Sequence, residues 1–275
     1  MTAPTEPVLA PEWFEPPLQN PSPYGLYAAT EWQPPLAPGS SPEGAAVRHL
    51  HGVQFKSVGN YGGSSAFGQW PDDSCVGGAP ITDELKTGTR PGDPDPFAAA
   101  TLWAYDECDA RPVTRTEVET RVAQVFRLEE QIAFEAEFAE RLLDDVTAPG
   151  AVTSLKEAVS YLETAVAKTN TVAFFHVSPA WVAREFGLFV RSGTAFRSPL
   201  GHLWVVGGGY ADTLGDTIVA TSPTYGWRNE TEVRPALARF DNTYAAVAER
   251  TVLVGYEKLI AAVEITLPTE PPTEP

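Results

Sequence analysis

The chain has 275 residues, of which 43% are hydrophobic and 11% aromatic, enough for one large domain or two modest ones with packed cores. Its formal net charge of −17 argues against a protein that grips nucleic acid through clustered Lys and Arg, and against a polybasic membrane anchor. No run of about 18 apolar residues predicts a membrane span, and residues 1–17 lack the basic and apolar regions of a signal peptide.

Residues 1–45 are rich in proline, interleaved with the aromatic residues Trp13, Phe14, Tyr24, Tyr27 and Trp32. Proline favours extended geometry, and large aromatic side chains are unusual in pure linkers. We therefore predict an extended arm that lies across another surface, with a disordered tail as the alternative.

Residues 52–110 are rich in Gly, Pro and Asp, and two short β-like runs, "VQFKSV" (53–58) and "ATLWAY" (100–105), stand near the two ends. A loop this long is uncommon inside a compact domain and is usually functional or stabilised by a partner. We predict a long two-stranded excursion with an irregular tip. The two cysteines, Cys75 and Cys108, are too few for a metal cluster; we expect reduced thiols, or else one bond that staples this loop.

Residues 111–145 contain no Gly and no Pro after Pro112, which predicts one long helix with Thr114 or Thr116 capping its start. Apolar residues recur at helical spacing, and about 30 residues would form a rod on the order of 45 Å. The predicted buried stripe is Val118, Val122, Val125, Ile132, Phe138 and Leu142.

Two shorter helices follow. In "TSLKEAVSYLETAVAK", Ser154 and Glu157 have capping-box spacing. In "SPAWVAREFG", Ser178 can cap the start, Pro179 takes the first helical position, and Gly187 can close the helix with a positive φ. The predicted buried stripe of the first helix is Leu155, Ala158, Val159, Leu162 and Val166.

The remaining pattern predicts strands, at 171–177, 203–207, 217–221, 245–257 and 259–267. The last two are separated by a short connection, so we expect them to form a long antiparallel pair. The final residues, "PTEPPTEP", form an acidic, proline-rich tail.

Three consecutive glycines, Gly207, Gly208 and Gly209, follow the strand "LWVV" and resemble the start of a phosphate-binding loop. A dinucleotide fingerprint would need a third glycine where Asp212 stands, together with a following helix, whereas "DTLGDT" is typical of a turn. The chain has no P-loop motif either. We expect a tight turn or a flexible loop between strands.

No residue pattern predicts catalysis, a cofactor or a metal site. His49 and His51 lack acidic or cysteine ligands at suitable spacing, so we expect solvated histidines. His176 has no nucleophile elbow to serve, and we expect a half-buried strand histidine bonded to backbone. The carboxylate pairs Glu129–Glu130 and Asp144–Asp145 fit a solvated helix face.

An extended arm, a long projecting loop and an overlong helix all expose surface that one subunit cannot bury. This pattern predicts a large symmetric assembly in which neighbouring copies bury these elements.

The order of these elements resembles the major capsid proteins of tailed phages, which have the α+β Hong Kong 97 capsid fold. The stretch "SLKEAVSYLETAVAKTNTVAFFHVSPAWVAREFG…SPLGHLWVVGGGYAD" is similar to the capsid pattern of helix, strand ending in His-x-x-Pro, short helix, and P-x-G before a "VVGGGY" strand. "AERTVLVGYEKLIAAVEITL" resembles the closing strands of the peripheral domain. The resemblance covers residues 50–267 and is strongest to phages that infect actinobacteria.

The resemblance implies a division of the chain into an extended N-terminal arm, an extended β loop over a neighbouring subunit, the spine helix of the peripheral domain, most of the axial domain, peripheral-domain strands, and the acidic tail. The corresponding ranges are 1–50, 52–110, 111–150, 151–240, 241–267 and 268–275.

The resemblance also implies a function. The chain would self-assemble into the pentamers and hexamers of an icosahedral head that encloses double-stranded DNA without sequence-specific binding and without a membrane. Portal, scaffold, protease and decoration proteins would be its partners, and the virion its location after assembly in the host cytoplasm.

Some family members crosslink a loop lysine to an asparagine; Lys56 or Lys86 with Asn242 could take these roles, although no motif fixes the match.

Two other classes stay open. One is an encapsulin-like cellular nanocompartment, which would carry protein cargo. The other is an enzyme or carbohydrate-binding module on an unrelated α/β fold, which would run as a small oligomer.

Overall fold

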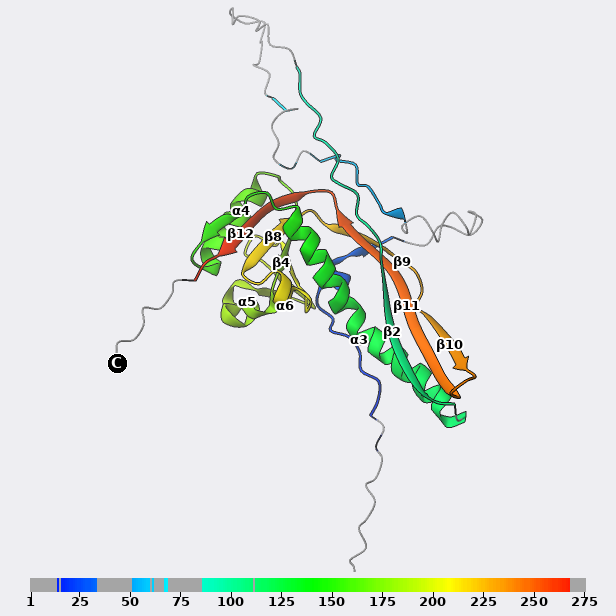
Figure 1. Cartoon of the computed structure of the whole chain (residues 1–275). Coiled ribbons are helices and arrows are strands. Elements are labelled where there is room, and N and C mark those ends of the chain that lie inside the picture. Colours follow the sequence, from blue (N-terminus) through cyan, green and yellow to red (C-terminus); the bar gives the residue numbers. More distant parts are fainter. Residues whose placement is uncertain are drawn as a thin grey trace, which may run out of the picture.

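The computed structural model describes residues 14, 16–33, 51–59, 61, 67–68, 86–110 and 112–267. Helices and two mixed sheets alternate along the chain, which confirms the α+β class. A long helix, α3 (Pro112–Asp144), runs beside both sheets (Figure 1). His49, Cys75, most of residues 1–50 and the tail 268–275 lie outside the described residues.

Helix α3 confirms the predicted rod, but its buried stripe differs from the prediction. Val125 and Ile132 are 40% and 45% exposed. The buried residues of the helix are spaced four apart along the chain, and the predicted stripe, which also used steps of three and seven, departs from this spacing. Each step of four rotates the buried face by about 40° around a helix. The face turns in this way because the two halves of α3 pack on different neighbours, first Val118, Val122 and Phe126, and then Phe134, Phe138 and Leu142.

The first sheet has the order β1-β9-β11-β10, and β2 also pairs with β11. Its central strand, β11, is antiparallel to β10, β2 and β9, and α3 covers β2 and the first half of β11. The strands are β1 (Glu31–Trp32), β2 (Ala100–Asp109), β9 (Thr224–Arg228), β10 (Glu232–Ala238) and β11 (Thr243–Tyr256).

The predicted two-stranded excursion is half right. "ATLWAY" lies in β2, but residues 53–58 are not a strand, and Val53 meets Phe97 only through an isolated bridge. Strand β2 pairs instead with β11, more than a hundred residues away in sequence.

The second sheet has the order β3-β12-β8-β4-β7-β6-β5. The helix α4 (Leu155–Ala167) packs against it through the predicted stripe, which is buried at all five positions. The strands are β3 (Gly150–Val152), β4 (Phe174–Val177), β5 (Val190–Ser192), β6 (Ala195–Arg197), β7 (Leu203–Val206), β8 (Thr217–Thr221) and β12 (Leu259–Ile265).

The predicted antiparallel pair of residues 245–257 and 259–267 is wrong. Strand β11 belongs to the first sheet, while β12 lies in the second, antiparallel to β8 and parallel to β3. Between them the backbone N–H groups of Glu257 and Lys258 donate to Ser222 Oγ, at 3.0 and 3.2 Å, and hold the chain where it crosses. The chain also passes from the second sheet to the first between β8 and β9. Strands β9 and β10 therefore belong to the first sheet although they precede residue 240, so a division at residue 240 does not separate the two sheets.

The caps of the two shorter helices follow the predicted chemistry in most details, but the predicted cap of α3 is wrong, because α3 begins at Pro112 and both Thr114 and Thr116 lie inside it. Ser154 Oγ accepts from the N–H of Glu157 at 3.3 Å, and the Glu157 carboxylate accepts from the N–H of Thr153 at 2.9 Å. Ser178 caps α5 (Pro179–Arg184), with proline in the first turn. Gly187 does not close this helix with a positive φ, because it lies inside a separate 3₁₀ turn, η2 (Phe186–Leu188).

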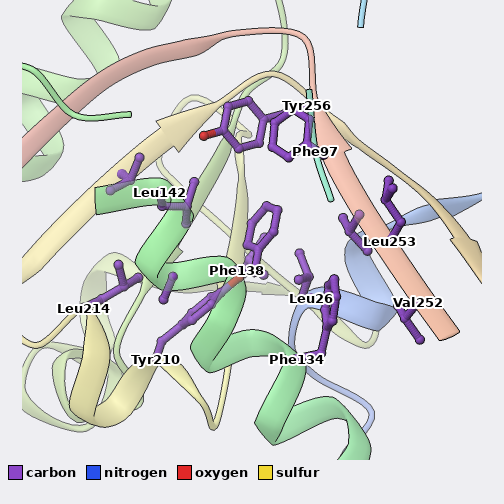
Figure 2. Packing of buried hydrophobic residues seen from close by; sticks show 14 of the residues in the cluster. Leu26, Phe97, Phe134, Phe138, Leu142, Tyr210, Leu214, Val252, Leu253 and Tyr256 are labelled. Carbon is purple, nitrogen blue, oxygen red and sulfur yellow. The ribbon is translucent and has the colours of Figure 1, made fainter. Parts of the chain in front are cut away.

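One of the two main hydrophobic cores lies where α3 meets both sheets. Figure 2 shows Phe134, Phe138 and Leu142 of α3 packed between side chains of β11 and those near α6 (Tyr210–Thr213). Leu26, from α1 (Leu26–Ala29), is fully buried in the same cluster. The second half of α3 therefore joins the two sheets and the N-terminal segment into one unit.

Candidate assembly interface

The three glycines form a close contact with α3 between β7 and α6. A Cβ at Gly209 would lie 2.2 Å from the carbonyl oxygen of Ile132 and 2.6 Å from the nitrogen of Ala136, which only glycine avoids. A short helix, α6, does follow the glycines, so the expected loop between two strands is wrong on that point. The glycines therefore allow the turn before α6 and the backbone of α3 to approach each other closely inside the protein.

The carboxylate of Glu135 lies at the centre of this contact. Its side chain is fully buried, and its oxygens accept hydrogen bonds from the N–H of Leu26 at 2.8 Å, the N–H of Gly209 at 3.0 Å and Gln131 Nε2 at 2.8 Å. Burial raises the pKa of Glu135, while these hydrogen bonds act in the opposite direction. Glu135 thus ties the N-terminal segment, α3 and the glycine turn together.

Sequence reasoning missed Glu135, although a signal was present. Glu135 falls between Phe134 and Phe138 on the apolar stripe, where a carboxylate is unexpected unless it has partners.

Two of the four paired carboxylates are bonded to other side chains, and of these Glu130 is buried and Asp145 is half-buried. Glu130 is only 8% exposed; Arg250 Nη1 lies 3.1 Å from each of its oxygens, and Tyr27 Oη donates to it at 3.1 Å. Asp145 accepts from Arg141 Nε at 3.0 Å and from Tyr256 Oη at 2.6 Å. The expected solvated face is therefore wrong for Glu130 and Asp145, because both sit where α3 or its C-terminal end contacts β11.

The N-terminal segment 16–33 runs along α3 and is held by side chains three or four residues apart on one face of the helix. Gln124 Nε2 donates to the Gln19 carbonyl at 3.1 Å, Arg127 Nη2 to Asn20 Oδ1 at 2.5 Å, and Gln131 Nε2 to the Tyr24 carbonyl at 2.7 Å. The described part of the predicted arm thus lies across a surface, which here is the chain's own long helix.

His176 is fully buried on β4, and its ring nitrogens bond to side chains. Nδ1 lies 3.0 Å from Tyr210 Oη and Nε2 lies 2.9 Å from Thr221 Oγ1. The expectation of a half-buried ring bonded to backbone is therefore wrong. Burial lowers the pKa of His176 to about 3, so the ring is neutral at pH 7 and acts as a core polar group.

This histidine should make the fold sensitive to acid. In the unfolded chain a histidine takes up its proton near pH 6.5, but His176 in the folded chain does so only near pH 3, so the unfolded state binds more protons between these values. We expect stability to fall by up to about 5 kcal/mol from this residue as pH is lowered through that range. Urea unfolding at several pH values should show that the free energy of unfolding falls less steeply with acid in His176→Gln than in wild type. The exposed His51→Gln variant is the control and should keep the wild-type slope. Equal slopes for His176→Gln and wild type would contradict the neutral, buried state of His176.

The other residues singled out in the sequence are placed as follows. His51 and Cys108 are exposed, and Cys108 on β2 is a free thiol. Across the described residues, no group of three or more His, Cys, Asp or Glu side chains could hold a metal ion. No helix in the described part of the chain is long and apolar enough to cross a membrane.

The lysines and the asparagine considered for crosslinking lie in different parts of the fold. Asn242 has a φ of 55° in the turn between β10 and β11, and its carbonyl accepts from the N–H of Ala110 at 2.9 Å. Lys56 and Lys86 are exposed in the extended segments before β2. The crosslink stays a prediction.

Large apolar side chains remain exposed on the first sheet. Trp103 and Tyr105 of β2 are 68% and 48% exposed, and Phe240 at the hairpin tip is 92% exposed. Every residue of the edge strand β10 is exposed, and so are most of residues 86–96. Exposed aromatic side chains on an otherwise paired sheet are candidates for contact with another subunit.

Comparisons with known proteins give no match by sequence and several by structure. No family model and no curated protein matches the chain. Solved structures similar to it are mostly from phage capsids.

Three of these solved structures cover 66% or more of this chain. The capsid of the cyanophage P-SCSP1u is 10% identical over 96% of this chain and 94% of its own, with a TM-score of 0.49. A structure from Gordonia phage Cozz is 11% identical over 97% and 92%, with a TM-score of 0.48. A virus-like particle from Pyrococcus furiosus is 9% identical over 66% and 77%, with a TM-score of 0.46.

Proposed function

We propose that this chain is a major capsid protein that assembles into the pentamers and hexamers of a phage head. The observation that carries the proposal is the uncovered surface along β2 and β10, with Trp103, Tyr105 and Phe240 exposed beside a 33-residue helix. A subunit on its own leaves this apolar surface in water, whereas neighbouring copies in a shell would bury it.

The two sheets suggest a division of roles. We assign α3 with β2, β9, β10 and β11 to the peripheral domain, and α4 with the seven-stranded sheet to the axial domain. The exposed segment 86–96 would belong to the extended loop that overlies a neighbour. The hydrogen bonds along α3 support an arm role for the N-terminal segment.

The bonding of the buried polar groups supports a structural role for this chain. His176 and Glu135, whose pKa values are shifted by burial, are both engaged by partners in the core. Within the proposal, the acidic chain encloses double-stranded DNA without gripping it. Portal, scaffold, protease and decoration proteins would be its partners, and the virion its location after assembly in the host cytoplasm.

Negative-stain electron microscopy of the expressed full chain tests this function. We expect closed shells of uniform diameter, because the exposed aromatic surface drives association of identical subunits. A chain that stays a small oligomer on gel filtration at all concentrations tested would overturn the proposal.

The contents of the shells separate a phage head from a cellular nanocompartment. Particles from the native source that hold DNA support the phage head. Particles that hold a defined protein cargo and no DNA would instead identify an encapsulin-like shell.

A further inference from the structure

A groove beside α3 collects three arginines in a chain that is otherwise strongly acidic. It is an open cavity of about 440 Å³ between residues 21–27, α3 and the β9–β10 turn. Arg127, Arg228 and Arg250 line it, and Glu130 is the acidic residue among its lining side chains in the described part of the chain. This groove therefore carries excess positive charge, against a net charge of −17 for the whole chain.

The three arginines are held in place, and the carboxylate among the described lining side chains, Glu130, pairs with Arg250. The buried Nε of Arg250 has no hydrogen-bond partner among the described residues. Arg228 stacks 4.1 Å above the Trp32 ring, and Arg127 bonds the neutral amide of Asn20.

The pKa of Arg228 shows that the positive charge is crowded. Burial lowers it first, and repulsion from Arg250 lowers it further, while Glu130, Tyr27 and the nearby Glu230 offset this in part. An added anion would relieve this repulsion.

The walls of the groove are partly apolar. Phe126 of α3, Pro21 and Val233 of β10 are among its lining residues. Arginine beside apolar and aromatic surface suits a peptide that combines carboxylates with proline rings.

The chain itself contains such a peptide. The tetrapeptide P-T-E-P occurs at residues 4–7, 268–271 and 272–275, all outside the described residues. The two adjacent copies place Glu270 and Glu274 four residues apart, which is about 12 Å in polyproline geometry. Proline-rich segments are already close to this extended form, so they lose less entropy when they bind.

We propose that this groove binds the acidic, proline-rich segment 268–275 of a second copy of the chain. The second copy is the occupant because β12, which precedes the segment, lies on the far side of the molecule from β9 and β10 (Figure 1). The inference rests on the proposed function, because assembly into a shell is what places a second copy beside the groove. It adds a specific tail-to-groove contact that would help lock subunits together.

A peptide-binding measurement tests the contact. The probe is a fluorescent octapeptide with the sequence of residues 268–275, and the receptor is the full chain carrying Glu270→Gln and Glu274→Gln, so that its own tail does not compete. We expect fluorescence anisotropy to show binding that weakens as salt is raised. Replacing both glutamates of the peptide by glutamine should weaken binding about five- to tenfold, since each glutamate contributes one exposed ion pair.

The groove is tested by matched arginine substitutions. Arg127→Gln with Arg228→Gln in the receptor should weaken binding by the same factor, whereas Arg121→Gln, whose side chain is 68% exposed elsewhere on α3, should leave it unchanged. Equal binding of the charged and the glutamine peptide would overturn the proposal. If the double variant does not fold, the glutamine peptide with the unaltered groove still decides the question.

Two further outcomes are informative. A DNA oligonucleotide that binds in place of the octapeptide, and is lost with the double variant, would overturn the proposal in favour of a nucleic-acid groove. Shells that form from the full chain while the octapeptide fails to bind would overturn the tail contact and leave the proposed function standing.

Discussion

Glu135→Ala is expected to lower the free energy of unfolding by about 3–5 kcal/mol, because it leaves the N–H of Leu26 and the N–H of Gly209 buried without their acceptor and removes one of the two acceptors of Gln131 Nε2. The loss exceeds that of an ordinary helix-surface change because the carboxylate is fully buried. Urea unfolding at pH 7 measures the difference.

Two further variants separate the hydrogen bonds from the helix itself. Glu135→Gln keeps the side-chain volume and one acceptor oxygen, so its loss should fall between wild type and Glu135→Ala. Exposed Glu140→Ala, on the same helix, should stay within about 0.5 kcal/mol of wild type. Equal losses for Glu135→Ala and Glu140→Ala would show that the junction contributes nothing.

Gly209→Ala is expected to destabilise the protein by about 3 kcal/mol or more, since the new methyl group would meet the backbone of α3 at 2.2 and 2.6 Å. A backbone cannot move aside as the end of a flexible side chain can, so either α3 or the β7–α6 turn must shift. Thermal or urea unfolding gives the magnitude.

The adjacent glycine is the matched control. A Cβ at Gly208 would meet nothing closer than Ile132 Cγ1 at 3.5 Å, an ordinary contact, so Gly208→Ala should change stability by less than about 1 kcal/mol. If the two alanine variants are equally stable, the close approach of the turn to α3 does not constrain the fold.

Both predictions concern the same junction, and the junction matters for the proposed shell. Glu135 joins α1, α3 and the glycine turn before α6, which belong to the N-terminal segment and to both proposed domains. A loosened junction should therefore change how the two domains and the arm are held relative to one another. Assembly defects in Glu135→Ala at temperatures where the subunit is still folded would be the expected consequence.

The local elements could be predicted from the sequence because their signals are short-range. Helix α3 follows from more than thirty residues without glycine or internal proline, and Ser154, Ser178 and Pro179 mark helix starts through contacts with the next few residues. The buried stripe of α4 follows from a single apolar neighbour, the second sheet. Surface that one subunit cannot cover could likewise be expected from the extended segments.

Contacts between residues far apart in the sequence could be determined only from the tertiary structure. Strand β2 pairs with β11 and not with residues 53–58, and β11 and β12 separate into two sheets, because strand partners are chosen by the packing of the whole chain and carry no short-range signal. Val125 and Ile132 are exposed because α3 changes neighbours along its length. Sequence reasoning predicted a solvated Glu130 and missed Glu135. Both are buried, because a charged group is stable in a core where residues distant in sequence supply its hydrogen bonds. The three glycines were visible from the start, but the backbone they approach lies about seventy residues earlier, and only the folded chain brings the two together.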